Sequence, residues 1–214
     1  MSNGPLQSIP ENAWVSGIAD RLRAPLPGIP AQAIMAPAGR ISSDYDPTPA
    51  GARQSAVLLL ITSARELVFI RRAEDGRPHG GQIAFPGGMR EDHDPDLETT
   101  ARRETEEEIG VPRDLPRTLG PLSPLYIPVT NFTVWPFVAT IPAFTEFALQ
   151  PEEVDEVLWF PIDSFQSALA EMDWTYDGTV YRVPAYRFGD AMVWGATAMI
   201  AAEFLVVWNE SVGI

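Results

Sequence analysis

An apolar run in the segment 54–61, QSAVLLLI, is the clearest hydrophobic pattern in the chain. Its length and its branched side chains predict a buried strand, and the segment at 66–72 predicts a neighbouring strand across a turn at residues 63–65. Three later segments also predict strands, at residues 118–122, at 131–141, and in the acidic stretch 150–159. The segment 174–186 predicts a hairpin around Asp177-Gly178. Pro136, inside the longest of these strands, predicts an edge position or a bulge.

The strongest helical pattern lies at residues 94–110. Asp94 can cap a helix, Pro95 suits its first position, and Gly110 provides a stop signal. Three weaker patterns predict further helices at 11–22, 163–170 and 194–208. Mixed strands around a long helix indicate an α/β fold, and we expect a three-layer α/β/α sandwich with a mixed central sheet.

Three carboxylates fall on one arc of the long helix. At about 100° per residue, Glu104, Glu107 and Glu108 face the same patch of space. Like charges four residues apart destabilise a helix, so this arrangement predicts a bound cation. Oxygen-only, anionic ligands favour Mg²⁺ or Mn²⁺, which also bind phosphate oxygens. The alternative is an acidic face that is simply solvated.

The spacing around these glutamates resembles the signature of Nudix hydrolases. In the run RETEEEIGV, residues 103–111, every charged and glycine position fits, and Thr105 replaces the usual aliphatic residue. The first half of the signature departs from the pattern. The interval from Gly88 to Arg103 is one residue longer than usual, and Asp94 or Asp96 stands where a glutamate is expected.

A second set of motifs is similar to the coenzyme A-type Nudix subfamily. It includes Arg72-Ala73, Arg77, the run HGGQIAFPGG at residues 79–88, and the segment VWGATA at residues 193–198. The resemblance covers residues 53–208 and implies the Nudix fold. It also implies metal-dependent hydrolysis of coenzyme A, or a derivative, to 3′,5′-adenosine diphosphate and a phosphopantetheine. Two alternatives stay open: another nucleoside diphosphate derivative as the substrate, such as ADP-ribose or a dinucleotide, or a non-catalytic module that senses a ligand.

The resemblance implies a role for each candidate site residue. The expected metal ligands are Glu104, Glu107, Glu108 and the Gly88 carbonyl. The expected catalytic groups are Glu107 or Glu153 as general base and Arg103, which would orient a glutamate. The expected substrate contacts are Arg72, Arg77, His79, Gly81, Phe85 and Gly87.

Composition limits the partners of this 214-residue chain. A net charge of −14 argues against nucleic acid and against an anionic membrane surface, because lysine and arginine would have to neutralise their phosphates. The chain has no cysteine and no long uninterrupted apolar segment, so we expect a soluble cytoplasmic protein.

The first 50 residues form a proline-rich extension, and we expect the Nudix domain to occupy residues 51–214. The proline density favours an extended backbone, as in an arm that wraps the domain or contacts a second subunit of a homodimer. A lid over the substrate is the less favoured alternative.

Overall fold

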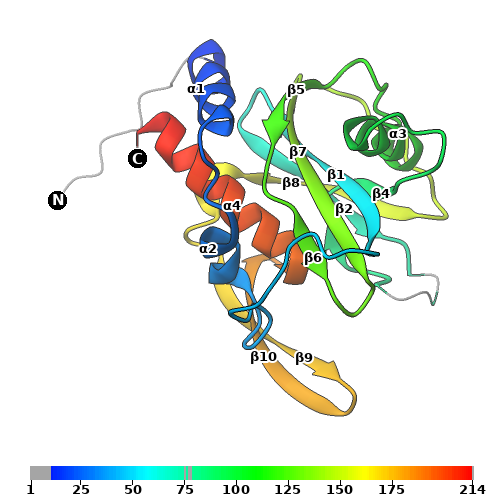
Figure 1. The fold of residues 1–214 in the computed structure, drawn as a ribbon. Helices are drawn as coiled ribbons and strands as arrows, with labels where there is room; N and C mark the ends of the chain where they lie inside the picture. The colour runs from blue at the N-terminus through cyan, green and yellow to red at the C-terminus, as the bar shows by residue number, and fades with distance from the viewer. Residues whose placement is uncertain (1–10, 75, 77–78, 214) are drawn as a thin grey trace.

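A mixed β-sheet forms the centre of the molecule, in a computed structural model that describes residues 11–74, 76 and 79–213 (Figure 1). Within these residues the sheet has eight strands, and its central order is β3-β2-β1-β7-β5. Strands β4, β6 and β8 pair with β1, β7 and β2, respectively. The strands are β1 (Arg53–Thr62), β2 (Glu66–Arg72), β3 (Ile83–Ala84), β4 (Gly87–Met89), β5 (Arg117–Pro121), β6 (Leu125–Ile127), β7 (Phe132–Ile141) and β8 (Val154–Pro161). β1 and β7 run parallel, and the other pairs are antiparallel.

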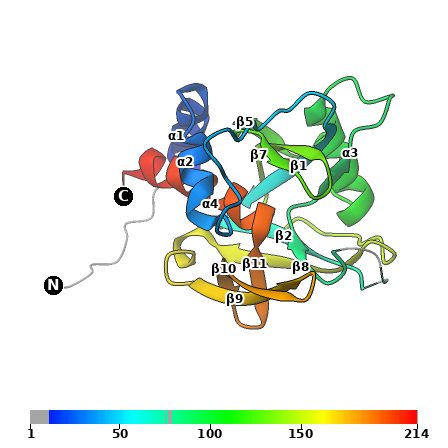
Figure 2. The ribbon, with the colours of Figure 1, turned by 60° about the horizontal axis from the view of Figure 1, so that its bottom comes forward.

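Helices cover the two faces of this sheet. α3 (Leu97–Ile109) lies on one side, and α4 (Gly195–Val212) lies on the other (Figures 1 and 2). Three shorter elements complete the helical part: α1 (Glu11–Arg23), α2 (Gly28–Gln32) and the 3-10 helix η1 (Ala33–Met35). The predicted α/β fold with a mixed central sheet is confirmed.

Alternation along the central strands divides the interior into two cores. In β1, Leu59 and Ile61 face the core shared with α4, whereas Leu58 and Leu60 face the core shared with α3. All four side chains are fully buried. Because successive side chains of a strand point to opposite faces, a sheet covered on both sides produces the continuous apolar run seen in the sequence.

The N-terminal residues contribute to the larger core. α1 and α2 pack beside α4 in both views of the ribbon (Figures 1 and 2). The ring of Trp14 lies 5.6 Å from that of Trp208, and Ile18 is fully buried. Residues 11–35 therefore belong to the packed interior.

A second, smaller sheet follows β8. It consists of β9 (Leu169–Tyr176), β10 (Thr179–Phe188) and β11 (Ala191–Trp194), in the order β11-β10-β9. The β9–β10 hairpin turns at Asp177 and Gly178, which both have positive φ, as the sequence predicted.

Two predictions about local structure are wrong. The helix expected at 163–170 is only the 3-10 turn η2 (Ile162–Ser164), because Leu169 already pairs with Tyr186 in the small sheet. Pro136 lies inside the sheet and not at its edge. It falls where β5 gives way to β6, and its carbonyl accepts a hydrogen bond from the Leu122 amide at 2.9 Å. A proline is tolerated there because the ladder is already interrupted.

None of the described helices has the length and apolar character that would carry it across a bilayer.

The packing of α1 predicts a loss of stability on truncation of Ile18. Ile18→Ala should lower the free energy of unfolding by roughly 2–5 kcal/mol, because it leaves a cavity in the core. Urea denaturation measures the change. Ser16→Ala, on the exposed side of the same helix, should stay within about 0.5 kcal/mol of the wild type. Equal effects of the two substitutions would show that α1 does not pack as described.

Candidate active site

The turn into β4 requires glycine. Gly87 has a φ of 148°, which side-chain-bearing residues rarely adopt, and a Cβ there would overlap the Ala56 carbonyl oxygen. The Pro86 carbonyl accepts a hydrogen bond from the Leu58 amide at 2.9 Å. The Gly87 amide, pointing away from β1, donates to Glu108 Oε2 at 2.8 Å. The turn thus joins the sheet edge to helix α3.

The ends of α3 are fixed by local signals. Asp96 is the N-cap and accepts a hydrogen bond from the Thr99 amide at 2.8 Å, so the helix starts two residues later than Asp94 would have placed it. Gly110 ends it in the left-handed conformation with φ 70°. These caps set the helix so that Glu104 and Glu108, one turn apart, both face β4.

Both glutamates lie against the glycine turn. Only 16% of the Glu104 side chain and 2% of the Glu108 side chain are exposed. A Cβ at Gly88 would overlap the Glu104 carboxylate. The two carboxylates and the β4 backbone therefore form one wall, and a side chain at position 88 would displace the Glu104 carboxylate.

Arg103 holds this wall in place from behind. Its guanidinium binds Asp94 through Nε at 3.1 Å and through Nη2 at 3.0 Å, and Nη2 also donates to the Met89 carbonyl at 3.0 Å. It contacts Glu104 Oε1 at 3.0 Å and Glu107 Oε2 at 2.8 Å. The predicted orienting partner of the glutamates is therefore in position to orient them.

Asp94 is a site residue whose role the sequence reading missed. Its side chain is buried, and it accepts hydrogen bonds from Arg103 and from the Thr100 hydroxyl at 2.9 Å. The Arg103 guanidinium holds the pKa of the Asp94 carboxyl well below its usual range. The only sequence signal was an acidic residue near the start of the helix, which predicted a helix cap.

The wall carries more negative charge than its surroundings neutralise. Burial raises the pKa of Glu104, and it raises that of Glu108 to about 8. Repulsion between these two groups and Glu153 adds to both shifts. Carboxylates that repel one another beside a space bounded by backbone oxygens fit a divalent cation, which would reverse the local electrostatics.

The wall is not a ready-made metal cage. Among residues 11–74, 76 and 79–213, no three His, Asp or Glu side chains form a group that could hold a metal ion. Glu107, predicted as a ligand and base, is half exposed and pairs with Arg103 at 2.8 Å and with Arg113 at 3.7 Å.

The backbone geometry favours Gly87 over Gly88 as a carbonyl ligand. Gly88 lies two residues before Arg90, whose amide donates to the Gln54 carbonyl of β1 at 3.0 Å. Alternate residues in a strand direct their backbone groups to the same side, so the Gly88 carbonyl belongs to the ladder. Gly87 instead directs its amide to Glu108, on the opposite side. The predicted role of the Gly88 carbonyl does not fit this arrangement.

Three of the residues predicted to contact the substrate lie between the end of β2 and the start of β3. Arg72 lies beside the wall, with Nη1 3.5 Å from Glu108 Oε1, and the exposed His79 has φ 74° and contacts Gln82 Oε1 at 3.1 Å. Gly81 also has positive φ, and a Cβ there would lie 2.7 Å from Glu74 Oε1.

Two of the predicted substrate residues are not placed at the site. Phe85 is 2% exposed and stacks on Phe69 at 4.5 Å, so its predicted contact with substrate is wrong: it supports the glycine turn from the core. Arg77 lies outside the described residues.

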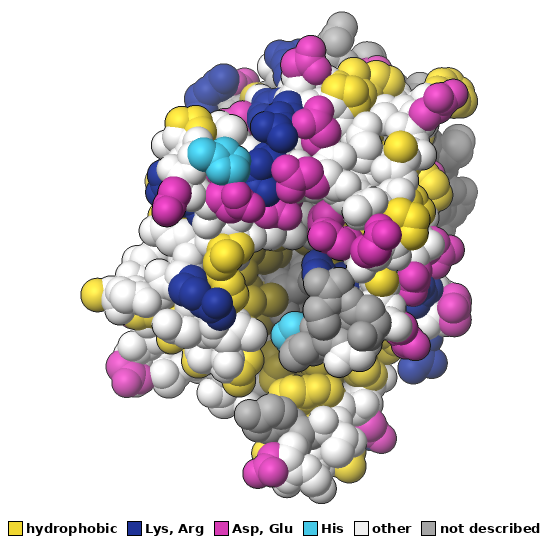
Figure 3. Space-filling model, turned by 90° about the vertical axis from the view of Figure 1, so that its right-hand side faces the viewer, with side chains coloured by type: hydrophobic (Ala, Val, Ile, Leu, Met, Phe, Trp, Pro, Cys, Tyr) yellow, Lys and Arg dark blue, Asp and Glu magenta, His cyan; other side chains and the backbone are white. Residues whose placement is uncertain are grey.

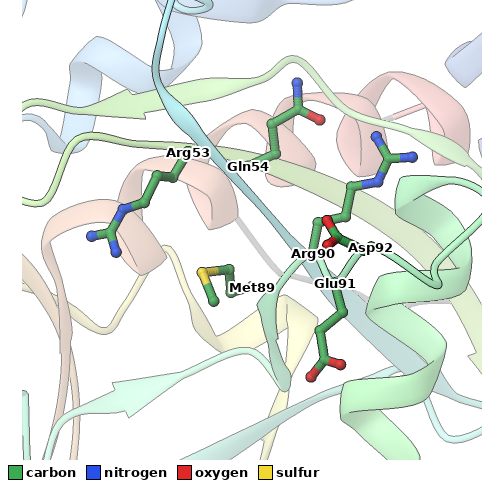
Figure 4. Close-up of a pocket in the computed structure, with 6 residues that line it drawn as sticks. All are labelled: Arg53, Gln54, Met89, Arg90, Glu91 and Asp92. Carbon is green, nitrogen blue, oxygen red and sulfur yellow. The ribbon is translucent and has the colours of Figure 1, made fainter.

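A hollow opens on the face of the molecule shown in Figure 3. In the space-filling view, a row of acidic side chains borders it above, and hydrophobic side chains lie within and below it (Figure 3). A separate cavity of about 390 Å³ flanks the end of β4, lined by Arg53, Gln54, Met89, Arg90, Glu91 and Asp92. In the close-up, Arg53 and Arg90 lie on opposite sides of Met89 (Figure 4). None of these residues was predicted to belong to the site.

Comparison with known proteins identifies the domain that carries this wall. The family model described as the NUDIX domain matches residues 52–182. The chain belongs to the Nudix family. An uncharacterized Nudix hydrolase NudL from Yersinia pestis is 36% identical over 152 residues, which cover 69% of this chain and 76% of that protein. The Yersinia pseudotuberculosis NudL gives the same values.

A solved Nudix structure agrees on the fold. The MutT/nudix family protein from Enterococcus faecalis superposes with a TM-score of 0.50 at 17% identity, over 77% of this chain and 65% of that one. The family and the relatives together make this Nudix protein a pyrophosphohydrolase. As in Nudix hydrolases generally, divalent metal ions are its expected cofactors.

The buried pair predicts that Asp94→Asn destabilises the protein. Loss of one partner leaves Arg103 without its buried, two-point counter-charge, at a cost of roughly 3–5 kcal/mol in urea denaturation at pH 7. Because the pKa of Asp94 is lowered in the folded state, its contribution is present above the unfolded value of about 3.9 and is lost as pH falls through the folded pKa. The wild type should therefore lose stability below about pH 4 more steeply than Asp94→Asn. If the free energy of unfolding varied with pH in the same way in both proteins, the Asp94–Arg103 ion pair would not stabilise the folded state.

Proposed function

We propose that this Nudix hydrolase cleaves the pyrophosphate bond of coenzyme A or a derivative, giving 3′,5′-adenosine diphosphate and a phosphopantetheine or acyl-phosphopantetheine. The support is twofold. The motifs at residues 72–88 and 193–198 are similar to those of the coenzyme A-type subfamily. The same chain carries the buried carboxylate wall that pyrophosphate chemistry requires.

One observation carries the proposal: Glu104 and Glu108 are held side by side against the glycine turn, with raised pKa values. When bound, Mg²⁺ or Mn²⁺ would neutralise the diphosphate oxygens and lower the pKa of a water molecule. In this proposal Glu104, Glu108 and the Gly87 carbonyl hold the ion. Arg103 fixes the rotamer of Glu104 and contacts no substrate, so its role is positioning.

Glu153 is the better placed of the two candidate bases. Its charge acts on both Glu104 and Glu108, and its backbone carbonyl is anchored by the Ala73 amide at 2.9 Å. Glu107 is instead half exposed and forms ion pairs with Arg103 and Arg113. Glu153 therefore removes the proton from the attacking water, the water oxygen bonds to phosphorus, and the bridging phosphorus–oxygen bond breaks.

Arg72, one of the residues predicted to contact the substrate, lies beside the carboxylate wall. Its guanidinium lies at the edge of the wall and is about one third exposed. A planar guanidinium can bind phosphate through two parallel hydrogen bonds. Arg72 therefore contacts a phosphate group of the substrate, and Arg77 is its predicted partner.

A substrate panel tests the proposal. Coenzyme A, ADP-ribose and diadenosine polyphosphates should be incubated with Mg²⁺ or Mn²⁺ and the products identified by mass. We expect kcat/KM to be highest for coenzyme A, with 3′,5′-adenosine diphosphate and phosphopantetheine as products. A higher kcat/KM for ADP-ribose or for a dinucleotide would replace coenzyme A as the substrate.

The carboxylate wall predicts the effect of neutral substitutions. Glu104→Gln and Glu108→Gln should each lower kcat by about 100-fold or more, since even groups that only orient a metal ligand contribute about 10–100-fold. Neither should lower the melting temperature much, because the folded site disfavours both charges.

Glu106→Gln provides the matched control. Glu106 lies on the same helix turn but pairs with Arg113 at 2.6 Å, away from β4. Its kcat should stay within about twofold of the wild type. Full activity of Glu108→Gln, or an equal loss of kcat in Glu106→Gln, would show that the carboxylate wall takes no part in the reaction.

A further inference from the structure

The small sheet has one apolar face that lies outside the main cores. Trp174 pairs with Tyr181 across the β9–β10 hairpin, and Trp194 pairs with Ala185 across β10 and β11. Directly opposite residues share a face, and so do alternate residues of one strand, so the four side chains lie on the same side. Ala185 and Val183 of this face are buried, yet neither belongs to the two main cores.

Aromatic side chains from three strands meet on this face. The ring of Trp174 lies 5.9 Å from that of Tyr181 and 5.5 Å from that of Trp194, with interplanar angles of 40° and 47°. The rings are tilted, so neither Tyr181 nor Trp194 stacks face to face on Trp174. Trp174 is the central ring of the three, and Tyr181, at one end, is 46% exposed.

The small sheet that carries the aromatic cluster contacts the strand that leads into the glycine turn. β11 contacts β3, and β3 leads directly into the glycine turn. In the space-filling view, hydrophobic side chains lie below the hollow, in the part of the molecule where the ribbon places the β9–β10 hairpin (Figures 1 and 3). The acidic row lies on the opposite border. The hollow therefore has one strongly charged border and one apolar border.

These two borders match the two halves of a nucleotide. Phosphates need cations or metal-loaded carboxylates, whereas a neutral planar base gains most from an aromatic surface. We propose that Trp174, Tyr181 and Trp194 form the wall on which the adenine ring of the substrate stacks. The inference rests on the proposed function to the extent that the substrate is an adenosine derivative. Trp194 lies beyond residue 182, where the match to the NUDIX domain ends, in the segment 193–198 that is similar to the coenzyme A-type subfamily.

Binding of product-like ligands tests the stacking wall without turnover. Adenosine 3′,5′-diphosphate and ribose 5-phosphate both lack a pyrophosphate bond, and they differ in the base. Isothermal titration with Mg²⁺ present should show that Tyr181→Ala and Trp194→Ala each lower the affinity for adenosine 3′,5′-diphosphate by about tenfold. This is the typical effect of losing one stacking partner. The affinity for ribose 5-phosphate should not change. Tyr181→Phe should restore binding, because it keeps the ring.

Val180→Ala is the matched control. Val180 precedes Tyr181 on the same strand, points to the opposite face and is 61% exposed. It should bind both ligands as the wild type does. With coenzyme A as substrate, Tyr181→Ala should raise KM and leave kcat within about twofold.

Two results would overturn the stacking wall: equal affinity of wild type and variants for adenosine 3′,5′-diphosphate, or an equal loss of ribose 5-phosphate binding in Tyr181→Ala. A wild-type protein that binds the base-containing ligand through these rings but does not hydrolyse coenzyme A would overturn the proposed substrate and leave the wall standing.

Discussion

The buried guanidinium of Arg103 is the contact on which the rest of the site depends. It is 2% exposed and is surrounded by Asp94, the Met89 carbonyl, Glu104 and Glu107. A buried cation is costly unless it is paired, and here Asp94 supplies a two-point ion pair. The remaining donors then position the glutamate that faces the turn. Because Arg103 is shared among several carboxylates, the wall keeps a net negative charge.

That net negative charge is tolerated because the sheet and helix are fixed independently of it. β1 is buried on both faces, and α3 is capped at both ends, so Glu104 and Glu108 cannot move apart without loss of packing. Their raised pKa values measure the cost of holding them there. A site that binds a divalent ion must carry this cost in the absence of the ion, and local instability of this kind is common where chemistry takes place.

A second buried carboxylate shows the opposite solution. Glu203 of α4 is fully buried and accepts hydrogen bonds from the Gly28 amide at 3.0 Å, the Gln32 side chain at 2.8 Å and the Ser123 amide at 3.2 Å. Neutral donors satisfy it, and it joins α2 and the loop before β6 to α4. The same residue type therefore ties the N-terminal segment to the core in one place and lines the glycine turn with negative charge in another.

The sequence alone determined the strands and helices whose signals are local. The run at 54–61, the Asp177-Gly178 turn and the glycine after residue 109 each specify backbone conformation through a few neighbouring side chains. The sequence also predicted that the signature glutamates share one face of the helix, because helical spacing alone puts them on one arc.

Only the tertiary structure decided which groups meet. Asp94 lies nine residues before Arg103, Trp194 lies 20 residues after Trp174, and Phe85 packs under the turn that it precedes. Leu169 begins a strand, and not the predicted helix, because its backbone pairs with that of Tyr186, 17 residues later. Such contacts depend on how distant segments pack together. Local propensity and spacing do not contain that information, because these contacts form only when distant segments pack together in the folded protein.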